Sequence, residues 1–256
     1  MARQSVKIGF AVILMATLLI TAVTFIPVNT GMEGVQVAIY TDRGVQATSR
    51  IALQNMFEWM HAEVSIIEAV DINDGILDAI DILVMPSGCW CSDRCLILGE
   101  EMNIIREFVE NGGSYFGIDG GASYATSYRL DIFHGTLYPD ACGAGDFLQE
   151  VTVNTNLNAP DLSQEPESYE LLYESSGYFD ADNMTGIATV AIYVNTSLPC
   201  MIAFKFETGT VFLSSPHPEY EEGSDRDGTD VYDSMQDPDS EWDFMLRICK
   251  WLVDQS

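Results

Sequence analysis

Hydrophobic and polar positions alternate in blocks along the first half of the chain, and the blocks predict strands and helices in turn. A β-branched run at 35–40 is typical of a strand that is buried on both faces. Residues 48–60 carry apolar side chains at helical spacing, and Thr48 or Ser49 can cap the helix that they predict. The same reasoning predicts three more strands and one more helix, with strands at 64–67, 81–85 and 114–118 and a helix at 99–111.

The order strand, helix, strand, strand, helix, strand predicts an α/β fold with a mostly parallel sheet and helices on both of its faces. After about residue 130 the pattern changes to loops and short strands, followed by an amphipathic helix at 242–253. The short strands are predicted at 148–153, 189–194, 201–206 and 210–213. Ligands of such sheets bind beyond the carboxyl ends of the parallel strands, which is where Gly88 and Asp119 stand in this sequence.

The beginning of the chain has a different pattern, an uncharged apolar run at 8–26 that Arg3 and Lys7 precede. At ~1.5 Å per residue the run is long enough to cross a ~30 Å hydrocarbon core, and a basic flank before it keeps the N-terminus inside. A cleaved signal peptide is the alternative, but the residues before Pro27 form a poor cleavage site.

The predicted organisation is a cytoplasmic stub at 1–7, a single transmembrane helix or signal segment at 8–26, a linker at 27–34 and an exported domain at 35–256. The domain is therefore expected on the extracytoplasmic side of the plasma membrane, or secreted if the segment is cleaved. Membrane contact is expected through the N-terminal helix alone.

Acidic residues dominate the composition. With 39 acidic and 11 basic residues the formal net charge is −28, and such a surface repels nucleic acid, which excludes nucleic-acid binding. Segment 219–243 alone holds eleven carboxylates and a single basic residue, Arg226. Its stretch 225–230 resembles a calcium loop but lacks the full spacing and the terminal glutamate. A solvated acidic loop is predicted, with calcium binding as the alternative and no metal site assigned.

Six cysteines form an even set, which in an exported chain favours disulfides. They are Cys89, Cys91, Cys95, Cys142, Cys200 and Cys249, and the sequence does not choose among their pairings. A metal site at 89–95 is disfavoured because no histidine stands nearby, and Cys249 is predicted to pack in the core. Asn183 and Asn195 each begin a sequon that a suitable host would glycosylate.

Two segments carry candidate chemistry. The stretch Gly117-Ile118-Asp119-Gly120-Gly121 has the form of a nucleophile elbow, in which glycines permit a sharp turn from strand to helix and one side chain stands out. Alone this pattern is weak, because glycine-rich turns after strands are common. The stretch 210–219 strengthens it, because His217 and Glu219 follow directly after another predicted strand.

With these segments the chain resembles the class I glutamine-amidotransferase-like superfamily, and within it the branch called the biotin-protein-ligase N-terminal domain. The similar stretches are 84–88, 105–113, 117–122 and the Ser-Pro-His-Pro-Glu run at 215–219. The resemblance covers about 35–253 and implies a flavodoxin-like sheet with a Cys–His–Glu triad.

Position by position, the resemblance implies that His217 is the base and Glu219 the acid that orients it. It also implies that the backbone N–H groups of Gly88 and Gly120 are oxyanion donors, with Gly121 completing the elbow. Asp119, however, occupies the position of the nucleophilic cysteine. No cofactor is implied.

An aspartate at this position disfavours the usual amidotransfer. A carboxylate is a far weaker nucleophile than a thiolate toward an amide, and it would pair with His217 and raise the pKa of the imidazole, which spoils a base. Replacement of the nucleophile by Cys89, Cys91 or Cys142 is the disfavoured alternative. The structural interpretations are a helix-capping aspartate and a hydrogen-bonded, half-buried histidine.

Three functional hypotheses remain open. The favoured one is a degenerate amidotransferase-like domain that binds a small molecule or a protein partner at the former active-site cleft. The second is an active hydrolase or transferase that uses Asp119, His217 and Glu219, because aspartate does attack phosphoryl, glycosyl and alkyl centres. The third is a surface interaction domain without an active site, and the paired elbow and His–Glu segments argue against it.

Overall fold

The computed structural model describes residues 31–88, 99, 101–182, 184–237 and 239–255. The predicted anchor at 8–26, Cys89, Cys91, Cys95 and the sequon at Asn183 lie outside these residues. Within the described part of the chain, no helix combines the length and apolar character needed to span a bilayer.

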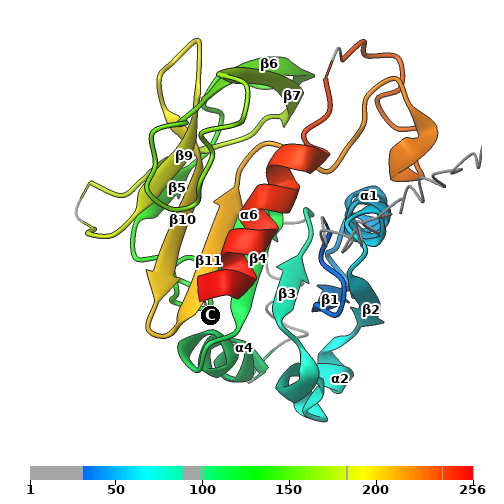
Figure 1. Cartoon of the computed structure of the whole chain (residues 1–256), viewed down its shortest axis with the longest axis vertical. Coiled ribbons are helices and arrows are strands. Elements are labelled where there is room, and N and C mark those ends of the chain that lie inside the picture. The colour runs from blue at the N-terminus through cyan, green and yellow to red at the C-terminus, as the bar shows by residue number, and fades with distance from the viewer. Residues whose placement is uncertain (1–30, 89–98, 100, 183, 238, 256) are drawn as a thin grey trace, which may run out of the picture.

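A nine-stranded sheet forms the centre of the molecule, with the strand order β2-β1-β3-β4-β11-β10-β9-β6-β7 (Figure 1). The strands are β1 (Gln36–Tyr40), β2 (Glu63–Ile67), β3 (Ile82–Met85), β4 (Ser114–Ile118), β6 (Asp146–Val153), β7 (Ser168–Glu174), β9 (Ala188–Tyr193), β10 (Pro199–Phe206) and β11 (Gly209–Ser214). A separate two-stranded sheet pairs β5 (Thr136–Tyr138) with β8 (Tyr178–Asp180).

The sheet is mixed, which corrects the expectation of a mostly parallel one. Strands β2, β1, β3, β4 and β11 are parallel and form the predicted α/β core. From β11 onward every pairing in the sheet is antiparallel, through β10, β9, β6 and β7. The change of direction arises where a tight turn with Glu207 at φ 52° joins β10 to β11, because a short hairpin connection imposes antiparallel pairing.

Helices cover both faces of the sheet, as the block pattern predicts. One hydrophobic core contains residues of α1 (Ala47–Trp59) and α6 (Trp242–Gln255), and the other contains residues of α2 (Ala69–Asn73) and α4 (Glu101–Glu110). Side chains of β4 alternate between them, since Phe116 belongs to the first core and Tyr115 to the second. In Figure 1, α6 crosses the near face of the sheet over β11 and β4.

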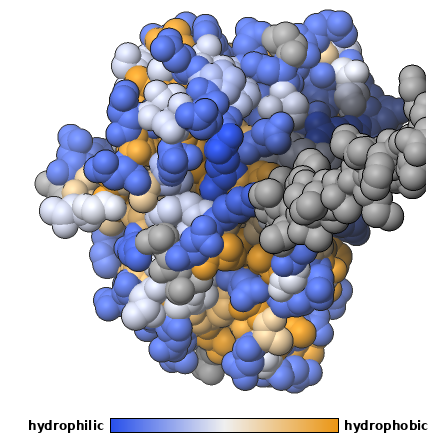
Figure 2. Space-filling view, in the orientation of Figure 1, coloured by the Kyte–Doolittle hydropathy of each residue, from blue (hydrophilic) through white to orange (hydrophobic). Residues whose placement is uncertain are grey.

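The predicted elements agree with the observed ones to within about two residues, but the sequence did not predict α2, β5, β7 or β8. Strand β7 reads Ser-Tyr-Glu-Leu-Leu-Tyr-Glu, and its glutamates and leucines favour helix, so composition hides the strand. Polar residues cover most of the face seen in Figure 2, in keeping with the 39 acidic residues of the chain.

Candidate functional site

The predicted elbow forms between β4 and the short helix α5 (Gly120–Tyr124). Asp119, at its tip, has φ 45° and ψ −105°, a conformation that side-chain-bearing residues rarely adopt. Two backbone hydrogen bonds hold it: Asp119 N–H donates to the Ser214 carbonyl at 2.8 Å, and Ser123 N–H donates to the Asp119 carbonyl at 2.8 Å. The turn therefore positions the carboxylate at the ends of β4 and β11.

The glycines of the elbow are required by close backbone contact. A Cβ at Gly120 would overlap the backbone of Gly88, and one at Gly121 would overlap the Met85 carbonyl. Helix α5 thus packs directly against the end of β3, with no room for a side chain. Gly88 lines the neighbouring cleft, and the oxyanion roles of Gly88 and Gly120 stay predictions.

His217 lies in the loop after β11 and is fully buried. Its Nδ1 is 3.1 Å from Oε1 of Glu219, which is also fully buried. The same Glu219 oxygen accepts a hydrogen bond from Ser49 Oγ at 2.6 Å, and Ser49 Oγ accepts one from Ser87 N–H at 3.2 Å. The His–Glu pair of the sequence is therefore a real contact that α1 and the end of β3 support.

A second glutamate, which the sequence did not reveal, faces the other ring nitrogen. Nε2 of His217 is 3.6 Å from Oε2 of Glu174, the last residue of β7. Although β7 is the edge strand of the sheet, its end returns to the site, because His217 N–H donates to the Leu172 carbonyl at 3.0 Å. No local motif marks Glu174, since only the tertiary path of the antiparallel strands brings it there.

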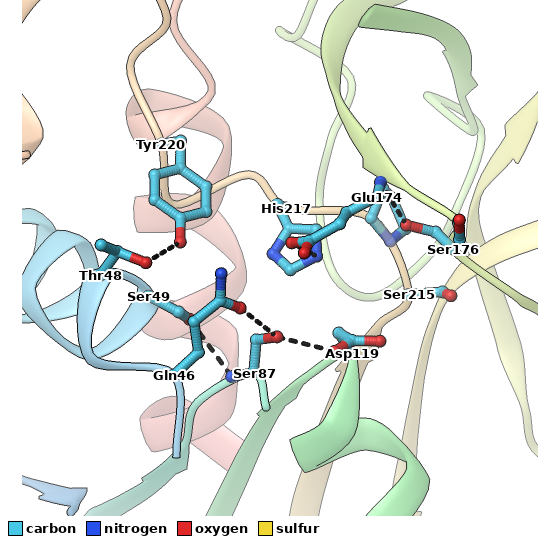
Figure 3. Close-up of polar contacts among 12 residues, drawn as sticks. Gln46, Thr48, Ser49, Ser87, Asp119, Glu174, Ser176, Ser215, His217 and Tyr220 are labelled. Carbon is cyan, nitrogen blue, oxygen red and sulfur yellow. Dashed lines mark hydrogen bonds and ion pairs between the residues drawn. The ribbon is translucent and has the colours of Figure 1, made fainter. Parts of the chain in front are cut away.

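Asp119 is 9% exposed and accepts a hydrogen bond at Oδ2 from Ser87 Oγ at 2.7 Å. The Ser87 hydroxyl oxygen also lies 3.0 Å from Gln46 Oε1. Figure 3 shows Ser87 and Asp119 at the strand ends below His217, with Glu174 beside the imidazole ring. Side chains from five separate segments thus lie together at this end of the sheet, and the catalytic roles expected for Asp119 and His217 stay predictions.

The charges of this site determine the protonation of His217. Burial lowers the pKa of its imidazole, but Glu219, Asp119 and Glu174 together outweigh burial and raise the pKa to about 9. Burial also raises the pKa of Glu174 above its ordinary value, against the opposing effect of His217. At neutral pH His217 is therefore an imidazolium, which has no lone pair with which to accept a proton.

A cleft of about 720 Å³ opens beside these residues. Its lining includes three carboxylates, those of Asp119, Asp146 and Glu174, together with Gln46 and Ser87. Among the described residues that line it there is no lysine, arginine or histidine. The cleft is therefore negatively charged and rich in hydrogen-bond acceptors.

The other sequence candidates lie elsewhere. Cys142, Cys200 and Cys249 are free thiols, and Cys249 is fully buried as predicted. Burial raises the pKa of Cys142 above that of an ordinary thiol, so it is not an activated nucleophile. Residues Asp225–Asp227 form a 3-10 turn, η2, in which Asp227 accepts backbone N–H bonds from Glu221 and Thr229. Asn195 is exposed, so its sequon is accessible.

Solved structures with the same fold define the class of this domain. A glutamine amidotransferase from Thermotoga maritima matches with a TM-score of 0.57 and 12% identity, covering 86% of this chain and 89% of that one. A cytoplasmic protein from Salmonella typhimurium matches with a TM-score of 0.55 and 10% identity, covering 85% and 98%. A beta-galactosidase from Bacillus circulans sp. alkalophilus matches over 31% of its own length, with a TM-score of 0.51, 10% identity and 86% of this chain covered. The described domain thus has the class I glutamine-amidotransferase-like fold.

The sequence also matches a known family over part of its length. Residues 35–131 match the family described as "Biotin-protein ligase, N terminal". The matched part includes the elbow and Asp119, whereas His217 and Glu219 lie beyond it. No curated protein matches the chain.

Proposed function

We propose that this domain is a degenerate glutamine-amidotransferase-like module that binds a small molecule at the cleft beside Asp119. The observation that supports this most strongly is the position of the buried His217 ring between two carboxylates, 3.1 Å from Glu219 and 3.6 Å from Glu174. A triad base must be neutral to take a proton, whereas the carboxylates around His217 raise its pKa to about 9 and so favour the imidazolium. Asp119 adds to that charge and does not supply the thiol of the related enzymes.

The cleft lining indicates the chemistry of the ligand. Three carboxylates, with no basic residue among the described side chains of the lining, favour a cationic ligand and repel phosphates and other anions. Gln46 and Ser87 add neutral polar groups beside Asp119. A small amine with further hydrogen-bond donors therefore fits the site, and a partner protein would present a lysine or arginine to it.

Ligand binding is testable by thermal shift and calorimetry with a panel of amines, amides, amino acids and nucleotides. We expect a cationic amine to raise the melting temperature of the wild type, and Glu174→Gln or Asp119→Asn to weaken its binding at least about tenfold, the cost of one lost charge-assisted contact. Glu170→Gln is the matched control, because Glu170 lies on the same strand but is exposed. A ligand that binds all four proteins equally would place its site elsewhere.

The strained backbone at Asp119 favours one alternative, in which this carboxylate is a nucleophile toward a phosphoryl, glycosyl or alkyl centre. Such an enzyme would form a covalent intermediate at Asp119, an acyl phosphate from a phosphoryl centre or an ester from a glycosyl or alkyl centre. Intact-mass spectrometry after rapid quench, with Asp119→Asn as the control, distinguishes the two. An adduct on the wild type that is missing in the variant supports the enzyme, and unmodified protein that still binds the ligand supports the binding module.

We also propose that residues 8–26 anchor the domain to the plasma membrane, with the domain on the extracytoplasmic side. This proposal rests on the apolar run and its basic flank in the sequence. The full chain is expected in the membrane fraction, resistant to carbonate extraction, with the domain open to protease added outside the cell. Recovery of the full chain from the cytosol would overturn the proposal.

A further inference from the structure

The loop between Glu219 and α6 gathers three carboxylates at one point. They belong to Glu222, Asp237 and Glu241, and one oxygen of each lies within 4.8 Å of the other two. Glu222 follows the His217–Glu219 segment by three residues, and Glu241 directly precedes α6. This cluster is separate from the cleft beside Asp119, because none of its members lines that cleft.

Two members of the cluster are buried, and among the described residues one carboxylate oxygen of each of the three lacks a hydrogen-bond donor. Glu241 is 1% exposed and Glu222 is 6% exposed. Within the described part of the chain, Oε1 of Glu241, Oε1 of Glu222 and Oδ2 of Asp237 have no hydrogen-bond partner. Buried carboxylate oxygens without donors are costly unless a proton or a cation balances them, so the structure as it stands leaves a charge to be neutralised.

The single basic side chain of the loop pairs with a carboxylate outside the cluster. Arg226 is the single basic residue of segment 219–243, and its guanidinium pairs with Glu221 at 3.2 Å. The same guanidinium lies over the rings of Trp59 and Trp242, 4.7 Å and 4.2 Å from their centroids. These contacts of Arg226 are with Glu221 and two tryptophans, and none of them is with a carboxylate of the cluster.

We propose that Glu222, Asp237 and Glu241 bind a divalent cation, Ca²⁺ in preference to other metals. An all-carboxylate ligand set suits hard cations, whereas zinc and copper sites use histidine or cysteine. Mg²⁺ keeps most of its water and uses one or two carboxylates, so three carboxylates that converge in an irregular loop favour the larger and more tolerant Ca²⁺.

Such a cation would connect the two ends of the loop. Trp242, next to Glu241, already donates from Nε1 to the carbonyl of Glu219 at 3.1 Å. A cation bound by Glu222 and Glu241 would add a second link between the beginning and the end of the loop. It would therefore stabilise the segment that positions His217 and Glu219, which gives the site a dependence on Ca²⁺.

The competing arrangement is a proton shared within the cluster. Burial is the main cause that raises the pKa of Glu222 to about 7, that of Asp237 to about 8 and that of Glu241 well above its ordinary value, so protons could balance part of the charge. The two arrangements respond differently to added metal, and this difference is what the experiment measures.

The test is titration of the EDTA-treated domain with CaCl₂ at pH 7.5, followed by calorimetry and thermal unfolding. We expect one saturable site and a rise in melting temperature of about 5 °C at a hundredfold excess over Kd. Tb³⁺ should occupy the same site and luminesce on excitation of Trp242, the neighbour of Glu241, and Ca²⁺ should displace it.

Glu241→Gln separates the cation from a purely structural role of the side chain. Without metal we expect this variant to melt at or above the wild-type temperature, because one buried charge is removed, yet to lose the response to Ca²⁺ and Tb³⁺. Asp243→Asn, two residues further on and exposed, is the control that keeps both responses. If Glu241→Gln does not fold, Glu222→Gln makes the same comparison. The proposal is overturned if the wild type shows no Ca²⁺ response, or if the cluster variant retains it.

Discussion

Asp119 stands at the tip of the turn between β4 and α5, where the resemblance to the amidotransferase-like superfamily implies a cysteine. Its carboxylate accepts from Ser87 and contributes to the charge that keeps His217 protonated. Glu219 and Glu174 flank the two ring nitrogens of the same histidine. The aspartate at the elbow and the two glutamates therefore form an environment that favours the protonated form of His217.

The raised pKa of His217 predicts a specific pH dependence of stability. A group whose folded pKa of about 9 lies above its ordinary 6.5 contributes stability that is complete below pH 6.5 and is lost as the pH rises through 9. The contribution at low pH is about 3 kcal/mol. Urea unfolding of the wild type and His217→Gln at pH 6 and pH 9.5 measures it.

The expected result is a difference in unfolding free energy between the two proteins that shrinks by roughly that amount at the higher pH. His134→Gln is the control, because its side chain is exposed and pairs with Asp131 at the surface. A difference between wild type and His217→Gln that is constant across this range would mean that His217 does not change protonation there.

At the scale of elements, the elbow depends on the direct packing of α5 against β3. Gly121→Ala places a methyl group against the Met85 carbonyl, so we expect a loss of about 3 kcal/mol of unfolding free energy. Gly186→Ala is the comparison, because Gly186 has φ +81° but open space around it. That change should cost only the backbone strain, about 1 kcal/mol. Equal losses in urea unfolding would contradict the packing argument.

Much of this arrangement could be predicted from local patterns. Apolar runs predict the strands at 35–40, 81–85 and 114–118. The glycines around Asp119 indicate the turn. Glu174 could not be found in this way. Its strand has the composition of a helix, and Glu174 lies beside His217 only because the loop after β11 pairs with β7 at Leu172. The same is true of Ser49, whose hydroxyl contacts Glu219 across 170 residues of chain.

At the scale of the whole molecule, the net charge of −28 is unbalanced on the surface as well as in the cleft. Self-repulsion of this kind opposes compact structure and is screened by salt. We therefore expect the unfolding free energy to rise by about 1 to 2 kcal/mol between 10 mM and 1 M NaCl. A fall over this range, measured by urea unfolding in the presence of EDTA, would show that attractive ion pairs dominate instead.

The surface charge and the buried carboxylates of the cluster should respond differently to salt and to Ca²⁺. Attachment through residues 8–26 stays a proposal that rests on the sequence, and no helix of the described residues could span a bilayer. Salt in solution screens the carboxylates of Glu222 and Glu241 poorly, because both side chains are buried. Salt should therefore act on the surface charges, whereas Ca²⁺ should act on the cluster.

Whether His217 serves as a base or as a fixed positive charge is tested most directly by NMR titration of its ring nitrogens in the wild type and in Asp119→Asn. We predict a pKa of about 9 in the wild type and a value lower by about one unit in the variant, because one of three neighbouring charges is removed. A wild-type pKa at or below 6.5, unchanged by Asp119→Asn, would contradict the assignment and restore His217 as a candidate base.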